Sequence, residues 1–227
     1  MTGSTVAQGG VPHEGEPYAS DLRRAGFLLS FAGIDFLLVI VVLEAVYPGY
    51  SIHHNTMSDL LAVGTGTSIV GEPMLFLAAI CWIAGAYYLY RHAGRTGMMV
   101  LNLLPGTGLL LAVLSPENVN LVLHSIGAVL AFVPGPIAAM LSYRSIRSSF
   151  RYHALSLGSL SLIGAVVEFG AYGTSLVQQG LGPGGWERVI VYPLLIWLVG
   201  FGSYLLAKST EREPGPSTLA SFTSPSR

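Results

Sequence analysis

The segment Tyr47–Leu61, YPGYSIHHNTMSDLL, is a polar stretch between two long apolar runs. It contains two histidines, an asparagine, hydroxyl residues and an aspartate, whereas the run before it (25–47) and the run after it (73–90) are largely apolar. At a rise of about 1.5 Å per residue, each run is long enough for a helix to cross a hydrocarbon core of about 30 Å. The pattern predicts that Tyr47–Leu61 lies outside the bilayer and connects two transmembrane helices.

The composition of the whole chain indicates that lipid is its main solvent. Of its 227 residues, 52% are hydrophobic and 10% are charged, and its mean hydropathy is +0.60. Soluble domains carry about 25% charged residues, so this chain has too few charges to cover a water-facing globule. The net charge of −1 argues against a nucleic-acid partner, which would be held through its phosphates.

Six apolar runs of this kind follow one another, and helices are expected because backbone groups in lipid must pair within their own segment. We therefore predict an all-α fold, a polytopic membrane protein with a six-helix transmembrane bundle. The expected spans are 25–47, 73–90, 97–114, 121–143, 153–177 and 189–207, within a domain at 23–208. The polar segments 1–22 and 209–227 are expected to be disordered cytoplasmic tails because they are rich in Gly, Ser, Thr, Pro and Glu.

The basic residues predict the orientation of the chain. Only Arg188 lies on one side of a six-span topology; the other ten of the eleven basic residues lie on the opposite side. These ten are Arg23, Arg24, Arg91, Arg95, Arg144, Arg147, Arg151, Lys208, Arg212 and Arg227. Because Lys and Arg are enriched in cytoplasmic loops, we expect a multi-pass protein of the cell membrane with both termini in the cytoplasm and Tyr47–Leu61 outside.

Small residues and prolines within the runs predict how the helices pack. Gly127 and Ala131 are four residues apart, a spacing that allows a neighbouring helix to approach closely. Pro105–Gly106 and Pro134–Pro136 interrupt two runs and predict bends, because proline removes an intrahelical hydrogen bond.

Polar residues inside the runs are candidates for function because a charge in the bilayer costs about 2.5–3.5 kcal/mol on insertion scales. Counted at about 1.5 Å per residue, Asp35 lies near the midplane, Glu168 in the outer third and His124 just below the outer end of its run. His124 and Glu168 are therefore expected at similar depth, beneath the loop that contains His53, His54, Asn55, Ser58 and Asp59. This placement predicts one outward-facing polar pocket. Alternatively, each residue pins the packing of its helix through hydrogen bonds.

The loop and the last outer turn suggest local roles for several polar residues. Ser58-Asp59 is expected to cap a short helix that starts near Thr56. Glu72 is placed to cap the second run, where a carboxylate favours the helix dipole. Arg188, the single outward basic residue, is expected to carry an anionic group or to pair with Asp59 or Glu117.

Catalytic and metal-binding motifs give little support for a specific reaction. The sequence has no HxxxH, HExxH or GxSxG motif, and a metal site needs three or four ligands. Such a site would require His124 together with Glu168, Asp59 or a loop histidine. We predict no metal and no other cofactor, and we name His124, Asp59 and Glu168 as the candidate catalytic residues.

Three groups of residues resemble the domain of unknown function 998 family. They are Tyr47-Pro48-Gly49-Tyr50 with His54-Asn55-Thr56-Met57-Ser58-Asp59-Leu60, then Leu114-Ser115-Pro116 with His124, and Gly185-Trp186-Glu187-Arg188 with Pro193 to Trp197. Leu61 stands where the family usually has glycine, and Ser115 where it has an aromatic residue. The resemblance covers about residues 25–207 and implies six membrane spans. It also marks the family-like polar positions Asn55, Ser58, Asp59, His124, Glu187 and Arg188.

These patterns favour a protein that binds a lipid or small molecule in the outward-facing pocket, or an accessory subunit that acts with a membrane-protein partner. The predicted ligand-binding residues are Asn55, Ser58, Asp59, His124, Glu168, Glu187 and Arg188. The alternatives are an intramembrane lipid-modifying hydrolase, metal-dependent or not, a proton-coupled transporter that uses Asp35, and a haem- or quinone-binding subunit. The hydrolase alternative loosely resembles the superfamily that contains alkaline ceramidases, but the last run, 189–207, lacks that group's paired histidines.

Overall fold

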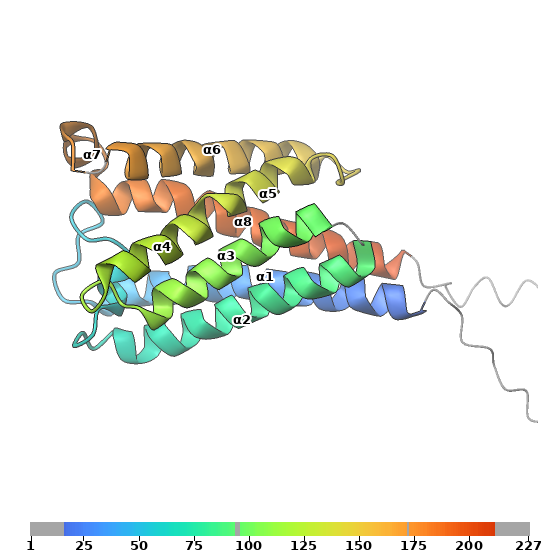
Figure 1. Cartoon of the computed structure of the whole chain (residues 1–227), viewed down its shortest axis with the longest axis horizontal. Helices are drawn as coiled ribbons and strands as arrows, with labels where there is room; N and C mark the ends of the chain where they lie inside the picture. Colours follow the sequence, from blue (N-terminus) through green and yellow to red (C-terminus); the bar gives the residue numbers. More distant parts are fainter. Residues whose placement is uncertain (1–15, 94–95, 172, 212–227) are drawn as a thin grey trace, which may run out of the picture.

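The computed structural model describes residues 16–93, 96–171 and 173–211, and in these ranges the chain forms helices and turns without strands (Figure 1). The long helices are α1 (Glu16–Val46), α2 (Ser68–Ala93), α3 (Thr96–Leu114), α6 (Phe150–Ala171) and α8 (Gly182–Thr210). The shorter elements are η1 (Ser58–Leu61), α4 (Leu121–Phe132), α5 (Pro134–Ser142) and α7 (Ser175–Gln179). The predicted all-helical fold is confirmed.

The helices are suited to a bilayer in length and composition. Five segments are long and apolar enough to cross a membrane, namely Ala19–Val46, Ser68–Arg91, Leu121–Ser142, Phe150–Ala171 and Gly182–Thr210. Val100–Leu114 is a shorter apolar helix. Five to six helices can therefore span a membrane, which indicates an integral membrane protein.

The helices form an elongated bundle whose two described termini lie at the same end (Figure 1). We call the opposite end, which carries residues 47–67, 115–120 and 173–181, the loop end. Helix α1 packs against both α2 and α8, and α3 packs against α2 and α4. Helix α6 lies along α8 and α5 but has few contacts with α4, so α4 and α6 separate from each other toward the loop end.

Helices α1 and α8 extend furthest beyond the apolar runs from which they were predicted. Helix α1 begins at Glu16, inside the segment 1–22 that was expected to be a tail, and α8 begins at Gly182, before the predicted span 189–207. The 31 residues of α1 measure about 46 Å, more than a hydrocarbon core of about 30 Å. A helix can continue into water, where an apolar pattern no longer marks it. The remaining tail residues, 1–15 and 212–227, lie outside the described ranges.

The prolines act differently in the two interrupted runs. Helix α3 continues through Pro105, whereas the run 121–143 divides into α4 and α5, with Pro134 as the first residue of α5. Proline is tolerated at the first position of a helix, where its missing N–H would have no intrahelical partner. The division changes the direction of the chain and tilts α4 away from α6 (Figure 1).

Close helix contacts at small residues stabilise the bundle. A Cβ atom at Gly127 would lie 2.6 Å from the amide nitrogen of Ala112, and one at Gly108 would lie 2.6 Å from the carbonyl oxygen of Gly127. The backbones of α3 and α4 therefore touch, as the small-residue spacing predicted. Buried polar groups add hydrogen bonds between helices, such as that from the Ser161 hydroxyl to the carbonyl oxygen of Ile190, at 2.6 Å.

Candidate functional site

The loop after α1 folds into the bundle instead of lying on top of it. Met57, Leu60 and Leu61 are 3%, 0% and 8% exposed, and they join the apolar core between α1, α2 and α8. The turn into η1 is held by a reciprocal pair. The Thr56 amide donates to the Asp59 carboxylate at 2.9 Å, and the Asp59 amide donates to the Thr56 hydroxyl at 3.2 Å. This reciprocal pair has the pattern of a capping box, but the N-cap of η1 is Met57 without a side-chain bond, and Ser58 donates to Glu117 instead. The predicted pairing of Ser58-Asp59 as a cap therefore holds for Asp59 in the preceding turn and not for Ser58.

Arg188 fastens this loop to two helices, and its partner differs from both predicted ones. Its guanidinium forms an ion pair with Glu44 of α1, with 2.6 Å between Nη2 and Oε1. It also donates to the Tyr50 hydroxyl at 2.6 Å and to the Gly184 carbonyl at 2.5 Å. The expected pairing with Asp59 or Glu117 is wrong, because Glu44 projects from the last turns of α1 directly toward the first turns of α8. We call Arg188, Glu44 and Tyr50 the latch.

The latch continues into the loop backbone through Tyr50. The Tyr50 hydroxyl donates to the carbonyl oxygen of Thr56 at 2.8 Å, directly before η1. Burial raises the pKa of Tyr50 to about 12, although the neighbouring Arg188 opposes that rise. Tyr50 therefore stays a hydrogen-bond donor at physiological pH, and the latch holds η1 at a fixed position.

Glycines at the start of α8 let the loop backbone approach. Gly182 has φ of 72°, a conformation that favours glycine. A Cβ at Gly184 would overlap the backbone carbonyl of Asn55 and would lie 2.5 Å from the carbonyl oxygen of Ile52. The glycine-rich sequence before Trp186 is thus a docking surface for the loop.

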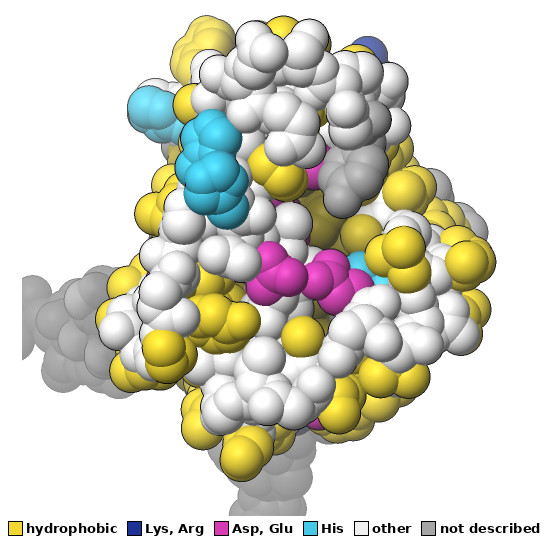
Figure 2. Space-filling model, turned by 90° about the vertical axis from the view of Figure 1, so that its left-hand side faces the viewer, with side chains coloured by type: hydrophobic (Ala, Val, Ile, Leu, Met, Phe, Trp, Pro, Cys, Tyr) yellow, Lys and Arg dark blue, Asp and Glu magenta, His cyan; other side chains and the backbone are white. Residues whose placement is uncertain are grey.

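A cavity of about 250 Å³ lies at the loop end, between the loop and helices α4, α6 and α8. Its polar lining consists of three carboxyl groups, a histidine and three hydroxyl groups, from Glu117, Glu168, Glu187, His124, Thr56, Ser58 and Ser125. Figure 2 looks onto this end and shows acidic side chains and a histidine around a central hollow, with basic side chains only at the edge. A smaller apolar cavity of about 50 Å³ adjoins it and shares Ser58, His124 and Glu187.

The three carboxyl groups differ in how far their hydrogen-bonding capacity is filled. The Ser58 hydroxyl donates to Glu117 Oε2 at 2.6 Å, and the backbone amide of Met57 donates to Glu187 Oε2. Glu168 is 6% exposed, and its Oε2 is buried without a hydrogen-bond partner. A residue that lines the cavity therefore carries an unfilled acceptor.

Glu117 is the carboxyl group of this cavity that lies in a turn between helices. Burial raises its pKa above the ordinary value of 4.5, and the neighbouring Asp59 carboxyl raises it further, while the bond from Ser58 opposes the shift. Two adjacent carboxyl groups resist carrying two negative charges. Glu117 therefore holds its proton more tightly than a free glutamate would.

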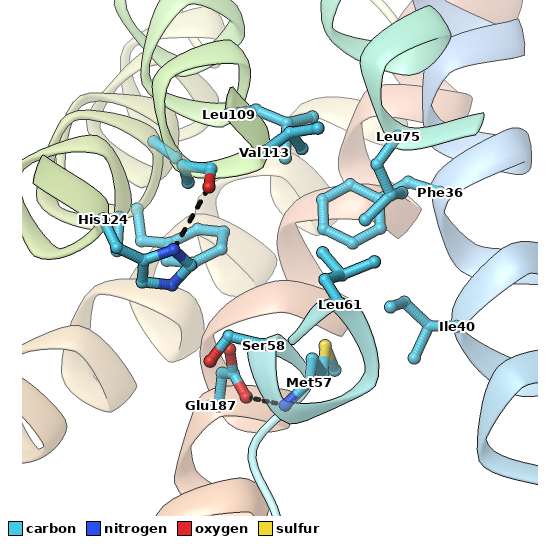
Figure 3. A pocket seen from close by; sticks show the side chains of 14 residues that line it. Phe36, Ile40, Met57, Ser58, Leu61, Leu75, Leu109, Val113, His124 and Glu187 are labelled. Carbon is cyan, nitrogen blue, oxygen red and sulfur yellow. Dashed lines mark hydrogen bonds between the residues drawn. The ribbon is translucent and has the colours of Figure 1, made fainter. Parts of the chain in front are cut away.

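His124 is oriented by the backbone of the preceding turn. Its Nδ1 lies 3.2 Å from the carbonyl oxygen of Ala112 and 3.1 Å from that of Ser115. Carbonyl oxygens only accept hydrogen bonds, so Nδ1 carries the proton. The other ring nitrogen points toward Ser58 and Glu187 (Figure 3). In neutral His124 this nitrogen is therefore an acceptor, or a base, at the cavity.

The predicted ligand-binding residues separate into two groups. Ser58, His124, Glu168 and Glu187 line the cavity. Asn55, Asp59 and Arg188 are absent from its lining and hold the loop, as when the Asn55 amide donates to Asp59 at 3.1 Å. Of the three candidate catalytic residues, His124 and Glu168 share the cavity, whereas Asp59 adjoins it through Glu117.

Two acidic residues singled out in the sequence, Asp35 and Glu72, lie outside the cavity, and one acidic residue that lines it was not predicted. Asp35 is 6% exposed with an unpartnered Oδ2, and it does not line this cavity. Glu72 lies beyond the first turn of α2, which begins at Ser68, so it does not cap that helix. Glu117 was not selected, although its position between Pro116 and the run that contains His124 could have identified it.

The geometry offers no ready-made metal site in the described part of the chain. No group of three or more His, Cys, Asp or Glu residues there is arranged so that it could hold a metal ion. What the arrangement can do chemically is accept hydrogen bonds and bind positive charge, and His124 can accept a proton.

A family model described as a protein of unknown function (DUF998) matches residues 30–204. The chain belongs to the DUF998 family. The match confirms the resemblance read from the loop, the 114–124 turn and the start of α8, and it covers every residue that lines the cavity. Comparison of this DUF998 chain with curated proteins and with solved structures gives no match. No specific function is established by the family.

Proposed function

We propose that this DUF998 protein spans the cell membrane six times, with both termini in the cytoplasm, and binds a lipid or small molecule at the loop end. The distribution of Lys and Arg supports this orientation, since ten of the eleven lie on the side of the termini. With 19 residues, α3 measures about 28 Å and is long enough to serve as the sixth span. The cavity then faces the outer side of the membrane.

The observation that carries the binding function is that Glu168, which lines the cavity, keeps a buried carboxyl oxygen without a partner. A buried polar group without a partner costs about 1–3 kcal/mol, so a site that retains one is suited to a partner from outside the chain. The cavity of about 250 Å³ approaches the size of small-molecule sites, about 300–1,000 Å³. It suits a head group or a small polar molecule.

Mass spectrometry of the protein released from native-lipid nanodiscs tests the binding function. Ala128→Phe fills the cavity, because Ala128 lines both of its parts. Val122→Phe is the matched control on the same helix, since Val122 is 70% exposed and does not line the cavity. We expect a ligand that stays bound to the wild type and to Val122→Phe but not to Ala128→Phe. Identical bound molecules in all three proteins would refute the proposal.

The orientation of His124 favours a second candidate function, a lipid hydrolase. With Nδ1 fixed by two carbonyl groups, its other nitrogen could act as a general base toward a molecule in the cavity. The test is the release of products from membrane lipids, followed by chromatography and mass spectrometry. Hydrolysis that His124→Gln abolishes, while the folded fraction is unchanged, would support this function. Equal turnover by the variant, or none by the wild type, would exclude it.

A further inference from the structure

The polar lining of the cavity consists mainly of acceptors. Its carboxyl groups, Glu117, Glu168 and Glu187, come from three different elements, and no Lys or Arg lines it in the described ranges. The nearest cation, Arg188, is 7% exposed and already bonded to Glu44, Tyr50 and Gly184. The cavity therefore lacks a positive charge and strong donors of its own.

The carboxyl oxygens are only partly filled by the chain. Glu117 receives the Ser58 hydroxyl and Glu187 receives the Met57 amide. Glu168 Oε2 is buried without a partner, and the side chain is more than nine-tenths buried. An ammonium group has three N–H donors and no acceptor, so it fits these acceptors and relieves their mutual repulsion. A phosphate or carboxylate would add to that repulsion.

The side of the cavity between α4 and α6 is apolar and exposed. Leu121 and Val129 of α4 are 63% and 42% exposed, and Phe169 of α6 is 39% exposed; all three line the cavity. These helices scarcely contact each other, because α6 packs against α5 and α8 instead. At this position in a membrane protein the exposed apolar side chains face acyl chains. A hydrocarbon tail can therefore remain among lipids while its head group enters the cavity.

We infer that the cavity selects an amphiphile with an ammonium head group, which enters from the bilayer between α4 and α6 and binds at Glu168, Glu117 and Glu187. This inference rests on the proposed binding function and specifies its ligand class. The ammonium bonds to Glu168 Oε2 and faces the other two carboxyl groups. The tail passes Leu121, Val129 and Phe169 into the outer leaflet.

Binding of four matched probes to the protein in nanodiscs of uncharged lipid tests the ligand class. The probes are dodecylammonium, dodecanol, dodecyl phosphate and ethylammonium. For each probe, the shift in unfolding temperature is measured as its concentration rises to saturation. We expect saturable stabilisation by dodecylammonium alone. Stronger stabilisation by dodecanol or dodecyl phosphate would overturn the ammonium assignment and leave the binding function standing. Equal stabilisation by ethylammonium would overturn entry of a lipid tail from the bilayer.

Variants distinguish binding of dodecylammonium in the cavity from its non-specific partition into the nanodisc lipid. Glu168→Gln should weaken dodecylammonium binding at least tenfold, because hydrogen bonds to charged groups are among the stronger ones. Glu72→Gln is the matched control, a half-buried acid of α2 outside the cavity, and should bind like the wild type. Ala128→Phe, which keeps all three carboxyl groups, should also abolish binding. Wild-type affinity in both cavity variants would overturn the inference. Identical bound molecules in the wild type, Val122→Phe and Ala128→Phe in the mass-spectrometric experiment would instead overturn the binding function itself.

Discussion

Removing the guanidinium of Arg188 should destabilise the protein through Glu44. Arg188→Ala leaves the Glu44 carboxylate, whose side chain is 16% exposed, with only the Tyr192 hydroxyl at 3.3 Å as a partner. Breaking a buried ion pair from one side costs about 3–5 kcal/mol, because the remaining charge is uncompensated. For a chain of this size each kcal/mol lowers Tm by about 2–4 °C, so Tm should fall by roughly 6–20 °C.

Thermal unfolding of the detergent-solubilised protein without added ligand measures this effect. Arg144→Ala is the control, because Arg144 is exposed, and its Tm should stay close to that of the wild type. The double variant with Glu44→Ala should be more stable than the sum of the two single changes predicts, by about 1–3 kcal/mol, since it leaves no unpaired charge. A normal Tm for Arg188→Ala, combined with loss of ligand binding, would refute the latch and return Arg188 to the role of an anion-binding residue.

Three further changes test the packing and the charge of the loop end. Gly184→Ala should lower the free energy of unfolding by about 1–3 kcal/mol, since its Cβ overlaps the loop backbone; Gly66→Ala, where a Cβ meets nothing within 4 Å, should be neutral in the same denaturation assay. Gly127→Val should separate α3 from α4 and lower Tm, and an unchanged Tm would contradict the close contact with Gly108. Glu117 has a raised pKa, so the proton it holds stabilises the folded state fully below about pH 4.5, and this contribution is lost as pH rises through the folded-state pKa. Tm measured against pH should therefore fall across that window in the wild type and less steeply in Glu117→Gln; parallel curves would refute the assignment.

The sequence predicts the helices well where lipid chemistry determines them. Long apolar runs are helical in a bilayer, so 73–90 lies within α2 and all but the last residue of 25–47 lies within α1. The helix boundaries outside the bilayer depend on tertiary contacts instead. Gly182–Gly185 has low helix propensity and lies before the predicted span 189–207. It is helical because the backbone at Asn55 packs against it, and no local pattern encodes that contact.

The sequence predicted the depth of the candidate site residues in the membrane but not which residues bond to each other. Counting residues along the runs placed His124 and Glu168 at the same level, and both line one cavity. The partner of Arg188 was missed because Glu44 is 144 positions away in sequence. It lies on α1, and counting residues along each run does not show that α1 packs against α8. Depth alone does not specify which helices are neighbours; that depends on close contacts such as Gly108 with Gly127.

The polar residues at the loop end divide according to whether the chain fills their hydrogen bonds. Arg188, Glu44 and Tyr50 bond to one another and to the backbone, so their charges and donors are used in holding the loop. Glu168, whose Oε2 has no partner, and His124 both line the cavity. In a membrane an unfilled polar group is costly, and Asp35 Oδ2, outside the cavity, is a second unfilled carboxyl oxygen. Under the proposed function, Glu168 is the unfilled acid that a ligand would meet, because Glu168 lines the cavity and Asp35 does not.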